Sequence, residues 1–233
     1  MNYFGGINAS PLYVRVKEIL IEMIQRGDFP SNRLPPESDL SELLGVSRTT
    51  IRETLATLNR EGIITKRHGI GNLIHRSTLD SKMRIDRYTD FVALLEDGGH
   101  TVRVDRVAYT WLRDGQTLFI ELCYFADEVP AIKAEVFVDG KNLQGDPLAD
   151  ESLYGTLPDF LNKYATEPVS HSLCYFRPAV VNGDSSELLD LPEGAPILEW
   201  NESFFSIFDR ELAQTKIHFN PSVVSFSLLR KWE

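Results

Sequence analysis

Apolar residues in the first part of the chain recur at helical spacing. The first such stretch has apolar positions three or four residues apart, at Leu12, Val16, Ile19, Met23 and Ile24. This spacing predicts an amphipathic helix over residues 11–26, which begins at Pro11 and ends at Gly27. The loop that follows is rich in Pro, Ser and Asn.

Two more helices and a hairpin are predicted after this loop. A short helix carries Leu40, Leu43 and Leu44 and ends at Gly45. Ser47 can cap the next helix, residues 48–61, because its hydroxyl can accept a hydrogen bond from a free backbone N–H. The segments IITKR, HGIG and NLIH then favour a strand, a turn and a strand. This order of elements is typical of a winged helix-turn-helix.

The pattern changes after a polar segment at residues 75–86. Beyond it, apolar residues alternate with a period of two, as in TVRVDRVAYTW, LFIELCYF and KAEVFVDG, with a turn at Asp114-Gly115. Further strands are predicted in SHSLCYFRPAVV, ILEWNESFFSIF, LAQTKIHF and near 223–230, and helices at 90–97, 153–164 and SSELLDL. The fold class is therefore α+β, with an antiparallel sheet in the second domain. We expect domains at 1–76 and 87–233, joined by a linker at 77–86.

Composition places few limits on this picture. The 233 residues suit one or two domains, and 42% hydrophobic with 25% charged residues is typical of a globular protein. No apolar run is long enough to span a membrane, and no secretory signal is visible. Cys123 and Cys174 have no metal-binding spacing. We therefore expect free thiols, a cytoplasmic location, and neither metal nor cofactor.

Charge is distributed unevenly along the chain. The net charge is −10, yet residues 1–76 contain 10 Lys and Arg against 8 Asp and Glu. The remaining residues contain 14 Lys and Arg against 26 Asp and Glu. A weakly basic first domain on an acidic second domain indicates that the first one contacts a polyanion.

The helix beginning at residue 48 carries side chains suited to reading DNA. Arg48 and Arg52 are four residues apart and share a face with Thr49 close by. Packing Ile51 and Leu55 inward would turn this face outward. A major groove admits one helix, and Arg can donate two hydrogen bonds to guanine.

The stretch RLPPESDLSELLGVSRTTIRETLATLNREGIITKRHGIGNLI resembles the DNA-binding domain of the GntR family of bacterial transcription regulators. Its LPPE loop, its VSRTTIRETL helix, its EGI strand entry and its GIGNLI wing correspond to the motifs of that family. The resemblance implies DNA contacts by Arg33, Ser47, Arg48, Thr49, Thr50, Arg52, His68, Gly69 and Gly71. The two glycines would let the wing backbone approach the minor groove. Many members have a basic residue where this chain has Ser38, so one contact is expected to be absent.

The second domain is similar to the UTRA effector domain of the HutC-like subfamily, whose fold resembles chorismate lyase. The matching segments are YTDF, WLRDGQTLFIELCYFADEVP, SLYGTLPDFLNKY, LDLPEGAPILEW and FDRELAQTKIHF. The resemblance implies effector contacts by Thr89, Tyr109, Trp111, Glu121, Tyr154, Gln214 and His218. Tyr109 and Trp111 replace an Arg pair that binds phosphate in some members. We therefore expect a small polar effector with a ring or apolar portion rather than a phosphosugar.

Three functional hypotheses follow. The favoured one is a homodimeric regulator, with repression the usual output, that binds a palindromic operator of double-stranded DNA and responds to a small-molecule effector. A second is a constitutive DNA-binding regulator whose second domain only dimerises. A third is a lyase-like enzyme fused to a DNA-binding domain. The sequence has no nucleophile elbow, HExxH motif or P-loop, so we expect no catalytic residues and no enzyme. No membrane partner is expected.

Overall fold

The computed structural model describes residues 11–87, 90–112, 115–149 and 157–232. The chain divides into two compact units, each described here by itself. Unit 1 consists of the chain up to Arg87 together with the C-terminal segment that starts at Ser227. Unit 2 runs from Tyr88 to Phe226.

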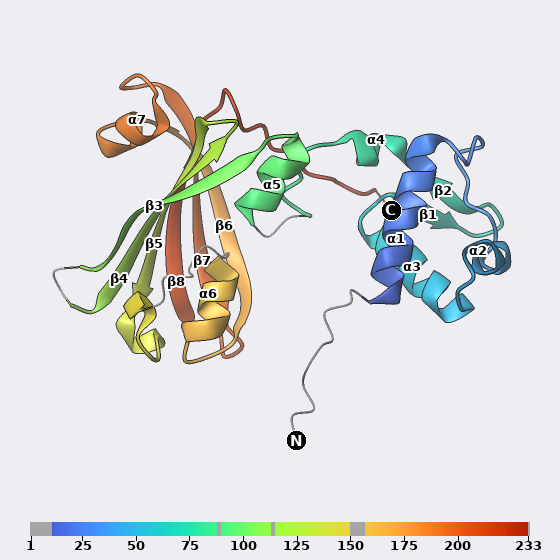
Figure 1. The fold of residues 1–233 in the computed structure, drawn as a ribbon, viewed down its shortest axis with the longest axis horizontal. Coiled ribbons are helices and arrows are strands. Elements are labelled where there is room, and N and C mark those ends of the chain that lie inside the picture. Colours follow the sequence, from blue (N-terminus) through green and yellow to red (C-terminus); the bar gives the residue numbers. More distant parts are fainter. Residues whose placement is uncertain (1–10, 88–89, 113–114, 150–156, 233) are drawn as a thin grey trace. The chain divides into compact units, whose positions relative to one another are not determined.

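Unit 1 is a winged helix-turn-helix, as predicted. Its helices and strands are α1 (Leu12–Arg26), α2 (Glu37–Leu44), α3 (Arg48–Arg60), β1 (Ile64–Arg67), β2 (Gly71–Ile74) and α4 (Arg76–Asp80) (Figure 1). β1 and β2 pair as an antiparallel hairpin. The apolar stripes of α1 and α3 meet in one core that includes Leu20, Ile24, Ile51 and Leu58.

Local sequence signals account for the ends of these helices. Gly27 and Gly45 end α1 and α2 in the left-handed conformation, with φ of 90° and 64°. Ser47 caps α3 by accepting a hydrogen bond from the N–H of Thr50 at 3.1 Å. The cap fixes the point at which the turn between α2 and α3 becomes helix.

The segment predicted as a polar linker contains ordered, buried residues. Residues 76–80 form α4, and Met83 and Arg84 are 5% and 3% exposed. The C-terminal segment lies alongside: Arg84 and Ser227 form a parallel bridge, and Ser227 N–H donates to the carbonyl of Met83 at 3.1 Å. The strand predicted near 223–230 does not form; this single bridge takes its place.

Unit 2 is built on one antiparallel sheet of six strands (Figure 1). The strands are β3 (Val102–Trp111), β4 (Thr117–Ala126), β5 (Val129–Asp139), β6 (Val169–Val180), β7 (Pro196–Ser206) and β8 (Glu211–Phe219). Their order is β3-β4-β5-β8-β7-β6, so β3 and β6 are the two edges. This arrangement confirms the predicted α+β class.

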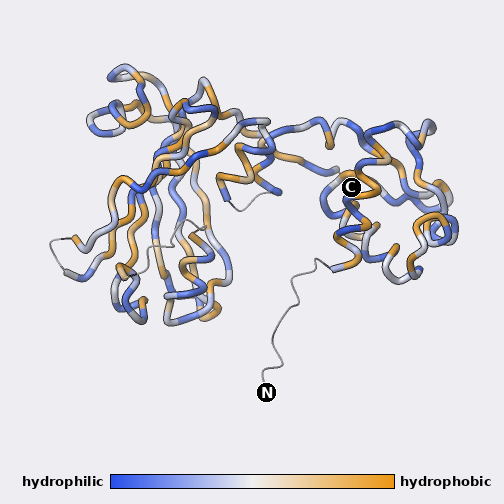
Figure 2. The backbone as a smooth tube through the Cα atoms, viewed as in Figure 1, coloured by the Kyte–Doolittle hydropathy of each residue, from blue (hydrophilic) through white to orange (hydrophobic). Residues whose placement is uncertain are grey.

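The two faces of this sheet differ in chemistry. The face that we call the apolar face carries residues such as Leu118, Val136 and Phe204. It is covered by α6 (Leu157–Tyr164), through Phe160 and Leu161, and by α5 (Phe91–Gly98), through Phe91. Hydropathy alternates along the strands accordingly (Figure 2).

The opposite face, which we call the polar face, carries charged residues. α7 (Asp184–Leu189) packs on it beside β5, at the end of the sheet away from α6 (Figure 1). Short 3-10 turns at Gly140–Asn142 and Pro147–Ala149 follow β5. Among the described residues, no helix is both long and apolar enough to cross a membrane.

Candidate nucleic-acid interface and effector region

The first turn of α3 presents polar side chains to solvent. Arg48, Thr49 and Arg52 are exposed, while Ile51 and Leu55 on the other side of the helix are buried. The free N–H groups and the helix dipole make this end of a helix favourable for a phosphate. Ser47 and Thr50 form the cap, with their hydroxyl oxygens 2.9 Å apart.

A carboxylate at the start of α2 holds one of these arginines. Arg52 Nε donates to Glu37 Oε2 at 2.7 Å, and Lys66 Nζ lies 3.6 Å from Glu37 Oε1. The hydrogen bond from Arg52 lowers the pKa of Glu37, so the carboxylate stays ionised. Glu37 thus brings a cation of α3 and a cation of β1 to one place.

The wing supplies the next cations. His68, Gly69 and Ile70 form its exposed tip, and Gly69 has a φ of 75° that favours glycine. Arg33 pairs with Leu73 of β2, and its side chain lies over Gly71. A Cβ added to Gly71 would lie 3.1 Å from Arg33 Nε. The absence of a side chain there lets Arg33 lie flat against the wing.

The nine residues predicted to contact DNA thus come from three neighbouring parts of unit 1: the loop before α2, the start of α3 and the wing. Arg33, Arg48, Thr49, Arg52 and His68 are exposed. Lys66 and Arg67 on β1 are exposed cations that the resemblance did not select. Their position beside the turn in KRHG was a signal that sequence reasoning could have used.

The predicted effector residues do not form one pocket. Thr89 and Tyr154 lie outside the described residues. In the register of β3 and β4, Tyr109 pairs with Ile120, whereas Glu121 pairs with Ala108. Successive residues of a strand point to opposite faces, so Tyr109 and Glu121 lie on opposite sides of the sheet. A single cavity lined by both is therefore not formed.

Tyr109 and Trp111 belong to the apolar face. Both pack against the cluster that contains Leu118 and Phe160. A Cβ added to Gly140 would lie 3.0 Å from the Trp111 ring, so this glycine makes room for the indole. A shallow pocket at the β3 edge is lined by Arg106, Val107, Ala108, Tyr109 and Leu148. Of the described effector residues, only Tyr109 lines it.

Glu121, Gln214 and His218 lie on the polar face. Lys133 Nζ lies 3.1 Å from Glu121 Oε1 and 2.9 Å from Glu135 Oε1, although Lys133 is only 3% exposed. Gln214 is exposed and donates to Glu211 at 2.9 Å. Sequence reasoning found Glu121 and His218 but missed Lys133, because a lysine in a polar-alternating strand is expected to point to solvent.

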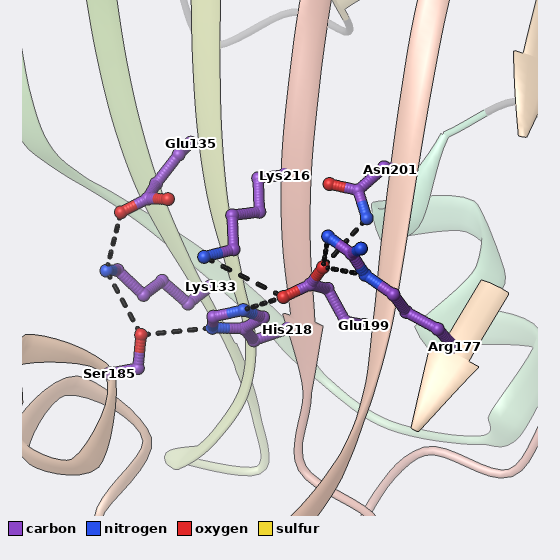
Figure 3. A network of polar contacts seen from close by, with 8 residues as sticks. All are labelled: Lys133, Glu135, Arg177, Ser185, Glu199, Asn201, Lys216 and His218. Atoms are coloured by element: carbon purple, nitrogen blue, oxygen red, sulfur yellow. Dashed lines mark hydrogen bonds and ion pairs between the residues drawn. The ribbon is translucent and has the colours of Figure 1, made fainter. Parts of the chain in front are cut away.

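A hydrogen-bonded chain connects this lysine to β7 (Figure 3). Ser185 Oγ lies 3.3 Å from Lys133 Nζ and 3.0 Å from His218 Nδ1, and His218 Nε2 lies 3.1 Å from Glu199 Oε2. Burial lowers the pKa of His218, so the imidazole is neutral at pH 7, with Nδ1 accepting from Ser185 and Nε2 donating to Glu199. This arrangement links α7 to the sheet.

Glu199 has further partners on the polar face. It is 5% exposed and accepts hydrogen bonds from Arg177 Nε at 2.6 Å and from Asn201 Nδ2 at 2.8 Å, and Lys216 Nζ is 3.7 Å away. Burial alone would raise the pKa of Glu199, but these bonds and that from His218 outweigh it and hold the pKa at about 2. Arg177 and Lys216 remain 66% and 43% exposed at their side chains.

The Ser185–His218–Glu199 chain has the composition of a hydrolytic triad. Its serine is 5% exposed and also lies beside the Lys133 ammonium group. A nucleophile must reach a substrate carbonyl, which this buried hydroxyl does not. This series of hydrogen bonds therefore connects α7, β5, β7 and β8 rather than forming a catalytic site.

Comparisons with known proteins agree with the fold of both units. Residues 12–74 match the family described as "Bacterial regulatory proteins, gntR family". The chain carries a DNA-binding domain of the GntR family. The whole chain is 26% identical over 206 residues to the histidine utilization repressor of Pseudomonas putida, covering 83% of this chain and 82% of that protein. It is 22% identical to the transcriptional repressor NagR of Bacillus subtilis strain 168, covering 81% and 82% of the two chains.

A solved structure supports the same fold. The crystal structure of the possible transcriptional regulator YydK from Bacillus subtilis matches with a TM-score of 0.70, covering 95% of this chain and 100% of that one at 16% identity. The likeness extends over both units, and the proteins that match most of the chain are named as transcriptional repressors rather than enzymes.

Proposed function

We propose that this GntR-family regulator is a homodimeric repressor that binds a palindromic operator and responds to a small-molecule effector in unit 2. The observation that carries the proposal is the exposed first turn of α3, where Glu37 orients Arg52 beside Arg48 and Lys66. A guanidinium oriented on one side by a carboxylate can present its other N–H groups to guanine O6 and N7. The protein would act in the cytoplasm, where its DNA is found.

The division of labour among the DNA-binding residues follows from their positions. Arg48 and Arg52, on the recognition helix, would contact base edges, with Thr49 on a base or phosphate. Ser47, Thr50 and the helix N-terminus would hold a phosphate. Arg33, His68, Gly69 and Gly71 would bring the wing to the minor groove. Lys66 and Arg67 would add phosphate contacts, which strengthen binding without reading sequence.

Repression is supported by the names of relatives. Curated proteins that match most of the chain include two histidine utilization repressors and the transcriptional repressor NagR. One winged helix reads a short half-site, so a palindrome requires two chains related by a two-fold axis. The edge strand β6 would provide a surface for this pairing, since Leu173, Tyr175, Phe176 and Val180 are exposed on it.

The effector would bind on the polar face of unit 2. The exposed Gln214 and the largely buried Glu121, which pairs with Lys133, are the predicted contacts on this face, and the exposed side chains of Arg177 and Lys216 offer positive charge there. A ligand with both a carboxylate and a cationic or ring portion would match these charges. Tyr109 and Trp111, on the other face, would act through the core. A constitutive regulator whose unit 2 only dimerises is the alternative.

The DNA-binding part is tested with a duplex selected from a random library by the wild-type protein. We expect affinity to fall steeply as salt rises, because Lys and Arg release counterions from DNA. Arg52→Ala should cost about 1–3 kcal/mol and relax the preference at one base pair. An equal loss on all sequences would show that Arg52 contacts only phosphate.

The effector part is tested by a thermal-shift screen of small metabolites. A ligand that binds the polar face should raise the melting temperature of the wild type and of Trp111→Ala, but not that of Glu121→Ala. Stabilisation of both variants as large as that of the wild type would contradict the proposed site. A screen without any stabilising ligand would favour the constitutive alternative.

A further inference from the structure

The C-terminal end of the recognition helix is capped by side chains from outside the helix-turn-helix. The last carbonyls of a helix have no partner within it and need other donors. Lys231 Nζ donates to the carbonyls of Asn59 and Arg60 at 2.6 and 2.7 Å. Arg84 Nη1 donates to the carbonyl of Glu61 at 3.1 Å. Two cations thus satisfy three consecutive carbonyls and oppose the negative end of the helix dipole.

The two capping residues come from the two segments that connect unit 1 to unit 2. Arg84 precedes the boundary at Arg87, and Lys231 follows the boundary at Ser227. The segments are paired with each other: Ile85 N–H donates to the carbonyl of Ser227 at 3.1 Å, and Ser81 Oγ and Ser227 Oγ are 2.8 Å apart. We call residues 81–87 and 227–232 together the double strap.

The strap is attached firmly at the α3 end. Arg84 is 3% exposed and pairs with Asp86 at 2.5 Å. The N–H of Leu229 donates to Asp86 at 3.4 Å, and the side chain of Leu229 fills the space over Gly62, where a Cβ would lie 2.1 Å from it. Any side chain at residue 62 would therefore displace the tail.

We infer that the double strap positions the recognition helix for DNA, with Arg84 and Lys231 as the positioning residues at the carbonyl end of α3. The inference rests on the proposed DNA-binding function. It assigns to the C-terminal tail a role in operator binding that requires no contact between the tail and DNA.

The test compares two neighbouring substitutions in the full-length protein. Lys231→Met removes the cap but keeps the aliphatic chain, whereas Arg230→Met removes the same charge from a residue that stacks on Trp232. With the selected duplex as probe, Lys231→Met should weaken binding by about two- to five-fold, the effect expected of a cation at a helix C-terminus. Arg230→Met should change it less, and Lys231→Arg should restore it.

Hydrogen exchange supplies a second measurement. In Lys231→Met, the amides of the last turn of α3 should exchange faster, while those of its first turn and the melting temperature change little. Equal effects of Lys231→Met and Arg230→Met on binding, or unchanged exchange in Lys231→Met, would overturn the inference. Arg52→Ala separates the two proposals, since it tests DNA binding without touching the strap.

Discussion

Arg52 Nε and Glu37 Oε2 are 2.7 Å apart, so the arginine that faces outward from the recognition helix is already held by a carboxylate of the preceding helix. Both side chains are partly exposed, and such a pair contributes little to folding stability. Its consequence is orientation, because the carboxylate holds the Nε edge of the guanidinium group, and the outer Nη edge can then donate to another acceptor. The Glu37 carboxylate also repels phosphate, which disfavours binding to DNA of arbitrary sequence.

Glu37→Gln should therefore lower specificity rather than affinity. We expect affinity for random-sequence DNA to rise by about two- to five-fold, since a negative charge is lost beside Arg52 and Lys66. Affinity for the selected duplex should not rise by the same factor, because Arg52 is held less firmly. Competition binding with the selected and random duplexes measures the ratio. Asp39→Asn, an exposed acid on the same helix, is the control, and an equal change of the ratio in both variants would contradict the role of Glu37.

The elements of unit 1 could be predicted from the sequence because their signals are local. Ser47, Gly27 and Gly45 mark helix ends by their own chemistry, and the structure has the ends there. The sequence did not predict which residues of neighbouring strands share a face of the unit 2 sheet. That depends on the register of β3 against β4, which the turn after β3 sets. A shift of one residue in register moves Glu121 to the face opposite Tyr109.

The burial of charged residues and the pairing of the C-terminal tail could not be predicted from the sequence either. Lys133 can be buried because its ammonium group is paired with Glu121 of β4, Glu135 of β5 and Ser185 of α7. The alternation of residues along β5 does not reveal these partners. Residues 223–230 have the alternation of a strand, but Ser227 forms its backbone bridge with Arg84 of the connecting segment rather than with a strand of the sheet. Long-range pairing of this kind leaves no periodic signal.

Gly71→Ala should weaken operator binding through Arg33. At this position φ is 102°, which costs an alanine about 1–2 kcal/mol, and the new Cβ would lie 3.1 Å from Arg33 Nε. The arginine must then move away from the wing. Fluorescence anisotropy with the selected duplex should show a loss that Arg33→Ala reproduces.

Gly27→Ala is the matched control for this substitution. Gly27 also has a positive φ, of 90°, but no atom lies within 4 Å of its added Cβ. It should lose similar stability and keep its DNA affinity. If both glycine variants weaken binding equally, the effect comes from stability and not from the position of Arg33.

Charges placed on the β6 edge should dissociate the proposed dimer. Tyr175 and Val180 are 64% and 58% exposed, so lysines there leave the fold intact while opposing close approach of a second edge. Sedimentation velocity of Tyr175→Lys/Val180→Lys should show monomers at concentrations where the wild type is dimeric. Binding to a palindromic duplex should weaken more than binding to a half-site.

The opposite edge provides the comparison. Val107 and Leu112 on and beside β3 are 44% and 37% exposed, and Val107→Lys/Leu112→Lys adds the same charge to the same sheet. This variant should remain dimeric. Monomers in this variant, with dimers retained in the β6 variant, would place the interface at β3.

Stability of unit 2 should fall as pH drops below 6.5, because of His218. Burial lowers the pKa of this imidazole in the folded protein, so the unfolded chain takes up its proton first. Stability from this residue is complete above the unfolded value of about 6.5 and declines below it. Glu199, with a pKa of about 2, adds a second decline that starts as pH falls below 4.5.

His218→Gln should remove the first decline and leave the second. The amide can donate to Glu199 and accept from Ser185 as the neutral imidazole does, but it does not titrate. Urea unfolding followed by tryptophan fluorescence at a series of pH values between 7 and 5 measures the effect. His171→Gln is the control, because that imidazole is 47% exposed at its side chain. If the wild type and His218→Gln lose stability in parallel over this range, protonation of His218 is not what weakens the unit, and the proton acceptor lies elsewhere.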